Sequence, residues 1–211
     1  RAMSRAVISA TEGKTAALLD MDVRSSYLPA TCRATGTGTD NIIVVQGRGR
    51  PIDNAGGHSK MGELIAKAIY AGVQEAIFKQ NGLVPNRGVF RRLKERRISV
   101  YSLLSEGKCD CSLTRSEIAG RLEHLLMAPE YANFVSAAMI IRDDYEKGLI
   151  TELSSLERWA HAVAEKIAGT GIDEMKAFGE LEALTPVMKT AFNALLNGVY
   201  HGSIAKGGTE K

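Results

Sequence analysis

The sequence has few cysteines for its length. Its 211 residues include only Cys32, Cys109 and Cys111, too few for a disulfide framework. Cys109 and Cys111 form a Cys-Asp-Cys pair, which makes a poor zinc site without a second pair of Cys or His residues. Because disulfides are rare in the cytosol, we expect reduced thiols and a cytoplasmic protein.

The sequence also has little excess charge of either sign. A formal net charge of +3 at pH 7 gives no indication of a nucleic-acid partner. One basic run, residues 91–97, contains apolar residues at helical spacing. It is predicted to be a solvated helix face, with a phosphate-binding stripe as the alternative.

Long apolar runs are absent as well. No run reaches the roughly 18 to 20 residues that cross a bilayer, so no membrane partner is expected. The opening residues, Arg-Ala-Met-Ser-Arg-Ala, are not followed by the apolar segment of a signal peptide. We expect Arg1 not to be the natural start of the protein. The 45% hydrophobic and 24% charged fractions are those of an ordinary globular protein.

Residues 1–82 are predicted to form an α+β region, in which helices pack on part of a mixed sheet. One face of an opening helix carries small and apolar residues: Met3, Val7, Ala10, Ala17 and Leu18. Residues 42–45 (Ile-Ile-Val-Val) have the length and flanks of a buried strand. An apolar stripe over residues 61–77 predicts a helix that Ser59 caps and that stops at residues 81–82 (Asn-Gly).

Residues 83–88 are predicted to be a linker, and residues 89–211 an all-α bundle of five or six short helices. The patterns Thr-x-x-Glu at 114–117 and Ser-x-x-Glu at 154–157 predict capping boxes. First helical turns are expected at two prolines, Pro129 and Pro186.

A loop of alternating threonine and glycine precedes the predicted strand. It comprises Thr35, Gly36, Thr37, Gly38, Thr39 and Asp40. Its glycines leave backbone amides uncovered, and its hydroxyls and carboxylate add polar groups. It is not a nucleotide-binding Walker loop, because no Gly-Lys-Ser/Thr follows and the loop precedes its strand. The pattern fits a ligand-binding loop or a plain tight turn.

Polar residues also gather at the start of the second predicted helix. His58, Ser59 and Lys60 follow two glycines, and Glu63 lies one turn further on. A helix N-terminus suits an anion or a developing oxyanion, and His58 is a candidate base there. Alternatively, His58 and Ser59 only cap the helix. In the opening helix, Glu12 and Thr15 face the same way, which alone indicates no more than a surface pair.

Three separated motifs together resemble the adenosylcobinamide amidohydrolase family (CbiZ). They are residues 10–15 (Ala-Thr-Glu-Gly-Lys-Thr), 34–40 (Ala-Thr-Gly-Thr-Gly-Thr-Asp) and 57–65 (Gly-His-Ser-Lys-Met-Gly-Glu-Leu-Ile). The resemblance covers residues 2 to about 80. It implies a corrinoid substrate, whose amide would be hydrolysed to adenosylcobyric acid and 1-amino-2-propanol.

For that reaction the sequence offers candidates rather than one assignment. Amide hydrolysis needs an activated water or nucleophile, oxyanion donors and an acid for the leaving amine. Asp40 or His58 is the candidate base, and Lys60 or Glu12 the candidate orienting group. The expected substrate-binding residues are Thr15, Thr35, Gly36, Thr37, Gly38, Thr39, Ser59 and Glu63. No cofactor or metal is required for this step, and we expect the three motifs to converge on one pocket.

The motifs belong to the C-terminal half of the domain that they resemble. The resemblance therefore implies a missing N-terminal half-domain or a partner chain, and a homo-oligomer is expected. A non-catalytic corrinoid-binding or assembly module is the alternative function. A nucleotide-binding protein that uses the loop at residues 35–40 is a third reading.

Residues 89 to about 205 resemble a helical phosphatase family that includes α-ribazole phosphatase (CobZ) and phosphatidylglycerophosphatase A. The resemblance rests on residues 93–101, 112–118, 137–150 and 162–170. It implies a second activity with Mg²⁺ held by carboxylates, for which Glu117, Asp143 and Asp144 are the candidates. Adjacent aspartates cannot both face one site on a straight helix. A solvated face, in a bundle that binds corrinoid or oligomerises, is the alternative.

Overall fold

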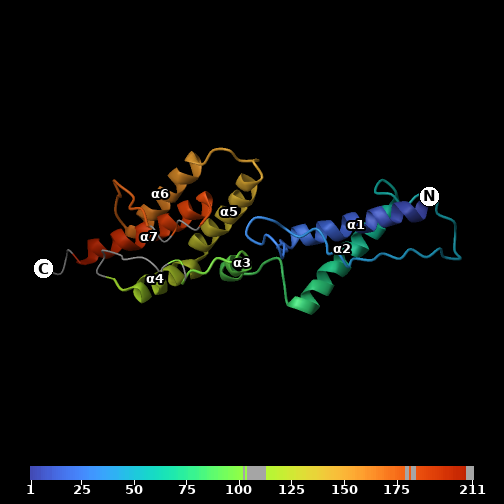
Figure 1. The fold of residues 1–211 in the computed structure, drawn as a ribbon, viewed down its shortest axis with the longest axis horizontal. Coiled ribbons are helices and arrows are strands. Elements are labelled where there is room, and N and C mark those ends of the chain that lie inside the picture. Colours follow the sequence, from blue (N-terminus) through green and yellow to red (C-terminus); the bar gives the residue numbers. More distant parts are fainter. Residues whose placement is uncertain (102, 104–112, 179–180, 182–183, 208–211) are drawn as a thin grey trace. The chain divides into compact units, whose positions relative to one another are not determined.

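The structure is a computed structural model of the chain. It describes all residues except 102, 104–112, 179–180, 182–183 and 208–211 (Figure 1). The chain divides into two compact units, Arg1–Arg87 and Gly88–Lys211. This division falls inside the predicted linker, residues 83–88. None of the described helices is long and apolar enough to span a membrane.

The N-terminal unit is built on two packed helices, α1 (Ala2–Asp20) and α2 (Lys60–Asn81). The face that α1 buries consists of small residues: Ala6, Ser9, Ala10, Gly13 and Ala17. A Cβ added at Gly13 would lie 2.6 Å from the carbonyl oxygen of Ala66. The two backbones therefore approach closely at Gly13, and only a glycine fits there. Met3 and Val7, which were predicted to lie on the same face as Ala10 and Ala17, are exposed.

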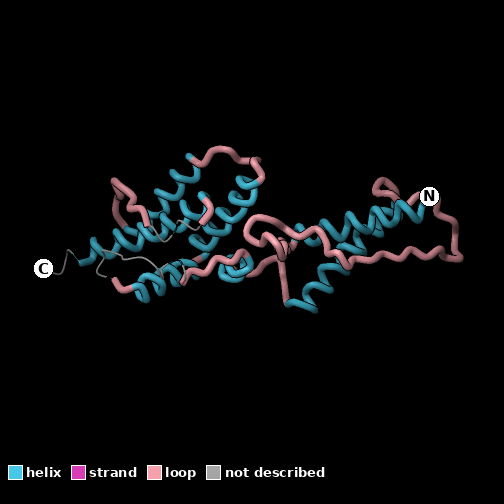
Figure 2. The backbone as a smooth tube through the Cα atoms, viewed as in Figure 1, coloured by secondary structure: helices cyan, strands magenta, loops and turns pink. Residues whose placement is uncertain are grey.

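The predicted mixed sheet is wrong. The described residues form helices and loops, and their only β-pairing is an isolated bridge between Arg24 and Arg33 (Figure 2). Residues 42–45 belong to no strand, and the side chains of Ile43 and Val45 are 87% and 82% exposed. A β-branched run forms a strand when a neighbouring strand bonds its backbone and a core covers its side chains. Neither is present around this run in the described part of the unit.

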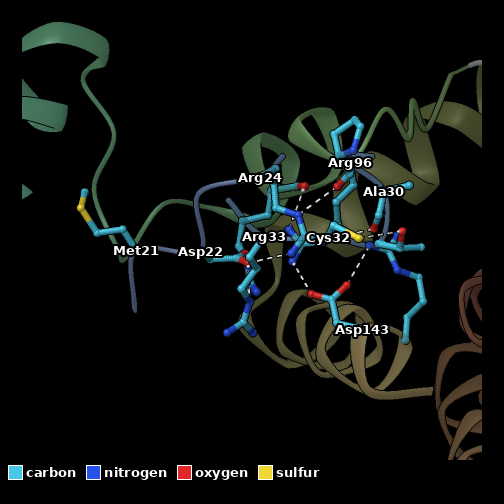
Figure 3. A network of polar contacts seen from close by, with 12 residues as sticks. Met21, Asp22, Arg24, Ala30, Cys32, Arg33, Arg96 and Asp143 are labelled. Carbon is cyan, nitrogen blue, oxygen red and sulfur yellow. Dashed lines mark hydrogen bonds and ion pairs between the residues drawn. The ribbon is translucent and has the colours of Figure 1, made fainter. Parts of the chain in front are cut away.

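Arginines fix the chain where it leaves α1. Asp22, which has a positive φ of 51°, accepts from Arg24 Nη1 at 2.9 Å and pairs with Arg33 Nε at 3.3 Å (Figure 3). The buried guanidinium of Arg87 donates to the carbonyl oxygens of Met21 at 2.8 Å and Asp22 at 2.9 Å. The end of α1 is therefore held by side chains far apart in sequence.

The second predicted helix is confirmed at both of its ends. Ser59 caps α2 by accepting from the backbone N–H of Gly62, and Gly82 ends the helix in the left-handed conformation with φ of 59°. The apolar stripe of α2 remains largely uncovered, since Leu64 and Ile69 are 50% and 37% exposed. Local signals thus place the helix correctly, while the N-terminal unit by itself provides little core for it.

The described residues of the C-terminal unit form five helices, which confirms the all-helical prediction for this region. They are α3 (Val89–Glu95), α4 (Arg115–Met127), α5 (Pro129–Glu146), α6 (Ser154–Ala168) and α7 (Pro186–Gly207). Helix α7 packs against α4, α5 and α6, and its Ala191, Phe192 and Leu195 are completely buried. The buried residues of the unit form one continuous core.

Most helix starts in this unit follow their sequence signals. Thr114 and Glu117 form the predicted capping box of α4. Pro129 and Pro186 are the first residues of α5 and α7, as predicted. The second capping box is wrong, because Leu153 is the N-cap of α6 and Glu152 accepts from the backbone N–H of Ser154 at 3.0 Å.

One residue of the basic run is not solvated. Arg91 and Lys94 are exposed, as predicted, but Arg96 is completely buried. Arg96 Nη2 lies 3.4 Å from the carboxylate of Asp143, which also accepts from Arg142 Nη2 at 3.0 Å (Figure 3). Arg96 is thus buried in the core with its guanidinium paired to the carboxylate of Asp143 on α5.

Candidate functional site

The threonine–glycine loop folds onto α1 through Asp40. One carboxylate oxygen of Asp40 lies 2.5 Å from Lys14 Nζ and accepts from the backbone N–H of Thr37 at 2.8 Å. The other accepts from the Thr37 hydroxyl at 3.1 Å. Thr15 donates its hydroxyl to the carbonyl oxygen of Thr35 at 3.2 Å. Two of the predicted motifs, residues 10–15 and 34–40, are therefore in direct contact.

These contacts decide the charge of Asp40. The hydrogen bond from Lys14, followed by that from the Thr37 backbone, lowers the pKa of Asp40 from 3.8 to about 2. A carboxylate with so low a pKa is a weak proton acceptor at neutral pH. The geometry thus favours Asp40 as the group that positions Lys14 and the loop over Asp40 as the general base.

Gly36 makes the contact between loop and helix possible. A Cβ at Gly36 would lie 2.6 Å from both Asp40 Oδ2 and Lys14 Nζ. Gly38, in contrast, has open space where its Cβ would be, with no atom within 4 Å. The hydroxyls of Thr37 and Thr39 are 3.1 Å apart on the exposed surface of the loop. Because Gly36 has no side chain, Asp40 and Lys14 can form their ion pair. The Gly38 end of the loop is open to a ligand.

The N-terminus of α2 is closed by its own cap. Ser59 Oγ accepts from Gly62 N at 3.1 Å and donates to the carbonyl oxygen of Gly56 at 2.7 Å. A Cβ at Gly62 would come within 2.0 Å of that same carbonyl oxygen, so the loop lies directly on the helix. His58 is exposed, and no described residue holds its ring by a hydrogen bond or an ion pair. Ser59 thus caps the helix, and the exposed side chain of His58 is available to a ligand.

Lys60 and Glu63 are engaged with each other on the surface of α2. Glu63 accepts from Lys60 Nζ at 3.0 Å and from Lys67 Nζ at 2.5 Å. These bonds, the one from Lys67 being the strongest cause, lower the pKa of Glu63 to about 2. The contacts do not place either residue against His58, so an orienting role for Lys60 stays a prediction.

The segment just before the third motif contacts α1 closer to the N-terminus of that helix. Ser9 donates to the carbonyl oxygen of Ala55 at 2.9 Å, and Arg5 donates to Asn54 at the same distance. Ser9 and Lys14 are five residues apart on α1, or about 7.5 Å along its axis. The described contacts join the threonine–glycine loop and residues 54–55 to α1, but they do not join His58 to Asp40. Convergence on one pocket therefore stays a prediction, as does a role for the exposed Glu12.

Sequence reasoning missed two residues of this arrangement. Lys14 lies inside the motif at residues 10–15 but was not singled out, although it is the ion-pair partner of Asp40. Ser9 is buried and anchors the segment before α2. Lys14 has no carboxylate three or four residues away on its own helix, and this sequence signal could have indicated a partner elsewhere in the chain. For Ser9 no sequence signal was available.

The carboxylates proposed for Mg²⁺ all have partners in the protein. Asp143 is buried with Arg96 and Arg142, and Asp144 lies 3.8 Å from Lys147. Glu117 accepts from both the backbone and the hydroxyl of Thr114 at 2.7 Å. The described residues contain no group of three His, Cys, Asp or Glu side chains that could hold a metal ion. The Cys109–Cys111 pair lies outside the described residues.

Comparisons with known proteins concern the N-terminal unit. Residues 1–85 match the model of the adenosylcobinamide amidohydrolase family. An uncharacterized protein of Methanocaldococcus jannaschii is 54% identical over 80 residues, which are 38% of this chain and 31% of the relative. The chain thus spans about a third of the length of that relative. No solved structure matches. The phosphatase resemblance of the helical unit is supported by none of these findings.

Proposed function

We propose that the N-terminal unit belongs to an enzyme that hydrolyses the amide of adenosylcobinamide in corrinoid salvage. The observation that carries the proposal is the family match over residues 1–85, which coincides with the compact unit Arg1–Arg87. The contact between the threonine–glycine loop and α1 supports it, since two motifs of the resemblance meet there. The proposed compartment is the cytoplasm.

The proposed reaction is a hydrolysis. Water adds to the amide carbonyl carbon, the C–N bond breaks, and a proton passes to the leaving amine. The products are adenosylcobyric acid and 1-amino-2-propanol. The transition state carries negative charge on the former carbonyl oxygen, so the site needs fixed positive groups there as well as a base for the water.

The residues of the unit are not equally suited to act as the base or to stabilise the oxyanion. Lys14, held by Asp40, brings a positive charge to the edge of a loop whose amides at residues 36–38 are candidate oxyanion donors. His58 is the better candidate base, because its ring is exposed and imidazole is the commonest general base in enzymes. Asp40 then acts through Lys14. No cofactor is needed for this route.

We further propose that another polypeptide segment, in the same protein or in a partner chain, completes the N-terminal unit. Its apolar side chains at Ile43, Val45, Leu64 and Phe78 are half or more exposed. The matched relative is about three times as long as the matched segment, which supports additional structure around it. Such a cover would bury the exposed side chains and could bring His58 and Lys14 to one substrate; a homo-oligomer is one form of it.

A non-catalytic corrinoid-binding module is the alternative. The low pKa of Asp40 favours it, because the loop then holds charge and donors but lacks a base of its own. Release of aminopropanol separates the two functions, since a binding module leaves cobinamide intact.

The test incubates the full-length protein, together with the segment that completes the N-terminal unit, with adenosylcobinamide and measures 1-amino-2-propanol and adenosylcobyric acid by mass spectrometry. We expect His58→Ala to lower turnover by about 10² to 10⁴. His161→Ala, a histidine change in the helical unit, is the control that leaves turnover unchanged. Lys14→Gln is compared in the same way with Lys79→Gln. Corrinoid binding without product supports the alternative function, and absence of both contradicts the two proposals together.

A further inference from the structure

The helical unit contains a cavity of about 420 Å³ between α4, α6 and α7. This volume is typical of small-molecule sites, which range over about 300–1,000 Å³. One wall consists of five residues of α4: Glu117, Gly120, Arg121, His124 and Leu125. The opposite walls are apolar and come from α6 and α7. The cavity lies within one unit and shares no residue with the amidohydrolase motifs.

The polar wall carries one guanidinium, that of Arg121, which makes no hydrogen bond with the described residues. Glu117, Arg121 and His124 are spaced by four and three residues, which puts them on one face of α4. Arg121 and His124 are exposed, and no hydrogen bond or ion pair joins either side chain to the described residues. Glu117 differs, because its hydrogen bonds with Thr114 lower its pKa and keep it ionised. The charge of Arg121 is a further cause of the low pKa of Glu117, so the wall offers one guanidinium with unused hydrogen-bond donors close to one fixed anion.

A glycine opens the cavity on the same wall. Gly198 of α7 has a packing reason, since a Cβ there would lie 2.5 Å from the Cβ of Ile167. Gly120 has no such reason, because a Cβ there would meet no atom within 4 Å. Glycine inside a helix is less stable than alanine. Packing therefore does not explain Gly120, whereas an open cavity wall does.

We propose that this cavity binds a small monoanion with an apolar body, a monocarboxylate. The guanidinium of Arg121 pairs with the carboxylate, which fits its planar fork of donors. The apolar body lies over Ile167 and Val199 on the opposite side. A single arginine neutralises a single negative charge, and the ionised Glu117 nearby opposes a second one. A monoanion therefore binds better than a dianion of the same shape.

The test titrates the full chain calorimetrically with octanoate, and with octyl phosphate and octylamine as probes of equal chain length. At pH 8, where the phosphate is a dianion, we expect saturable binding of octanoate and weaker binding of the other two. Arg121→Gln weakens octanoate binding about tenfold or more, as expected for loss of a hydrogen bond to a charged group. Arg115→Gln, on the same helix outside the cavity, leaves it unchanged.

A second variant separates binding from folding. Gly120→Leu places a side chain in the cavity while favouring the helix, so octanoate binding is lost and the melting temperature is kept or raised. Octanoate binding that survives Gly120→Leu contradicts the proposal, because the probe then binds elsewhere, for instance on the apolar surface of the N-terminal unit. Tighter binding of octyl phosphate, or no saturable binding of octanoate, also overturns it.

Discussion

The two units of this chain differ in what their helices bury. In the C-terminal unit, α7 is surrounded by other helices, and large residues such as Phe192, Leu195 and Met139 are completely covered. In the N-terminal unit, α1 and α2 touch through small residues, and large apolar side chains such as Phe78 stay exposed. Both units have clear sequence signals for helices, but only the C-terminal unit buries its large apolar side chains in a continuous core.

This contrast separates helix formation from folding energy. Caps and periodicity determine where a helix begins and ends, while most of a protein's stability comes from buried apolar surface, at about 25 cal/mol per Å². We therefore expect the C-terminal unit to be stable alone and the N-terminal unit to gain most of its stability from the segment that covers it. The predictions below compare the units, beginning with the largest effect.

Removal of a large ring should affect the two units very differently. Phe192→Ala empties part of a closed core and should cost about 3–5 kcal/mol of unfolding free energy. Phe78→Ala removes an exposed ring and should change it by less than about 0.5 kcal/mol. Denaturant titration followed by the fluorescence of Trp159, the one tryptophan, reports on the C-terminal unit; circular dichroism follows both units. Equal losses in the two variants would contradict the contrast.

Loss of an ion-paired aspartate should also depend on burial. Asp143→Asn leaves Arg96 and Arg142 buried without their shared carboxylate, and should cost about 3–5 kcal/mol. Asp40→Asn removes an exposed pair with Lys14 and should change the free energy of unfolding far less. The same denaturation experiment measures both. A stability loss in Asp40→Asn as large as that in Asp143→Asn would show that the threonine–glycine loop contributes strongly to the free energy of unfolding.

Two glycines of the N-terminal unit should respond in opposite directions. Gly13→Ala forces the helices apart at Ala66, and should cost about 1–3 kcal/mol. Gly72→Ala, on α2 where a Cβ meets nothing within 4 Å, should stabilise the unit by about 0.5–1 kcal/mol. Thermal melts by circular dichroism compare the two variants. Stabilisation by Gly13→Ala would mean that α1 and α2 do not pack at this point.

The smallest expected effect is the pH response of the loop. The pKa of Asp40 lies near 2 in the folded chain and near 3.8 without its partners, so its contribution to stability is complete above about pH 4. That contribution is lost as the pH falls through about 2. A carboxyl ¹³C NMR titration measures this pKa, and Lys14→Met should raise it toward 3.8. An unchanged pKa in that variant would remove Lys14 as the main cause.

The sequence by itself determined the features that depend on neighbours along the chain. Ser59 and Gly82 mark the ends of α2, Thr114 and Glu117 form a capping box, and Pro129 opens α5. Each of these signals acts within one helical turn, so residues four or fewer positions apart contain all the information. The three motifs of the N-terminal unit were recognisable in the same way, as short strings of residues.

Only the tertiary structure decided which residues meet across long stretches of chain. It paired Asp40, a candidate base, with Lys14, and this ion pair lowers the pKa of Asp40. It also buried Arg96, which pairs with Asp143. It left residues 42–45 outside any strand, because a strand depends on a partner that β-propensity does not specify. Burial and pairing are sums over distant neighbours, so local residue patterns fix the helices of this protein but not the charges and exposures of its candidate sites.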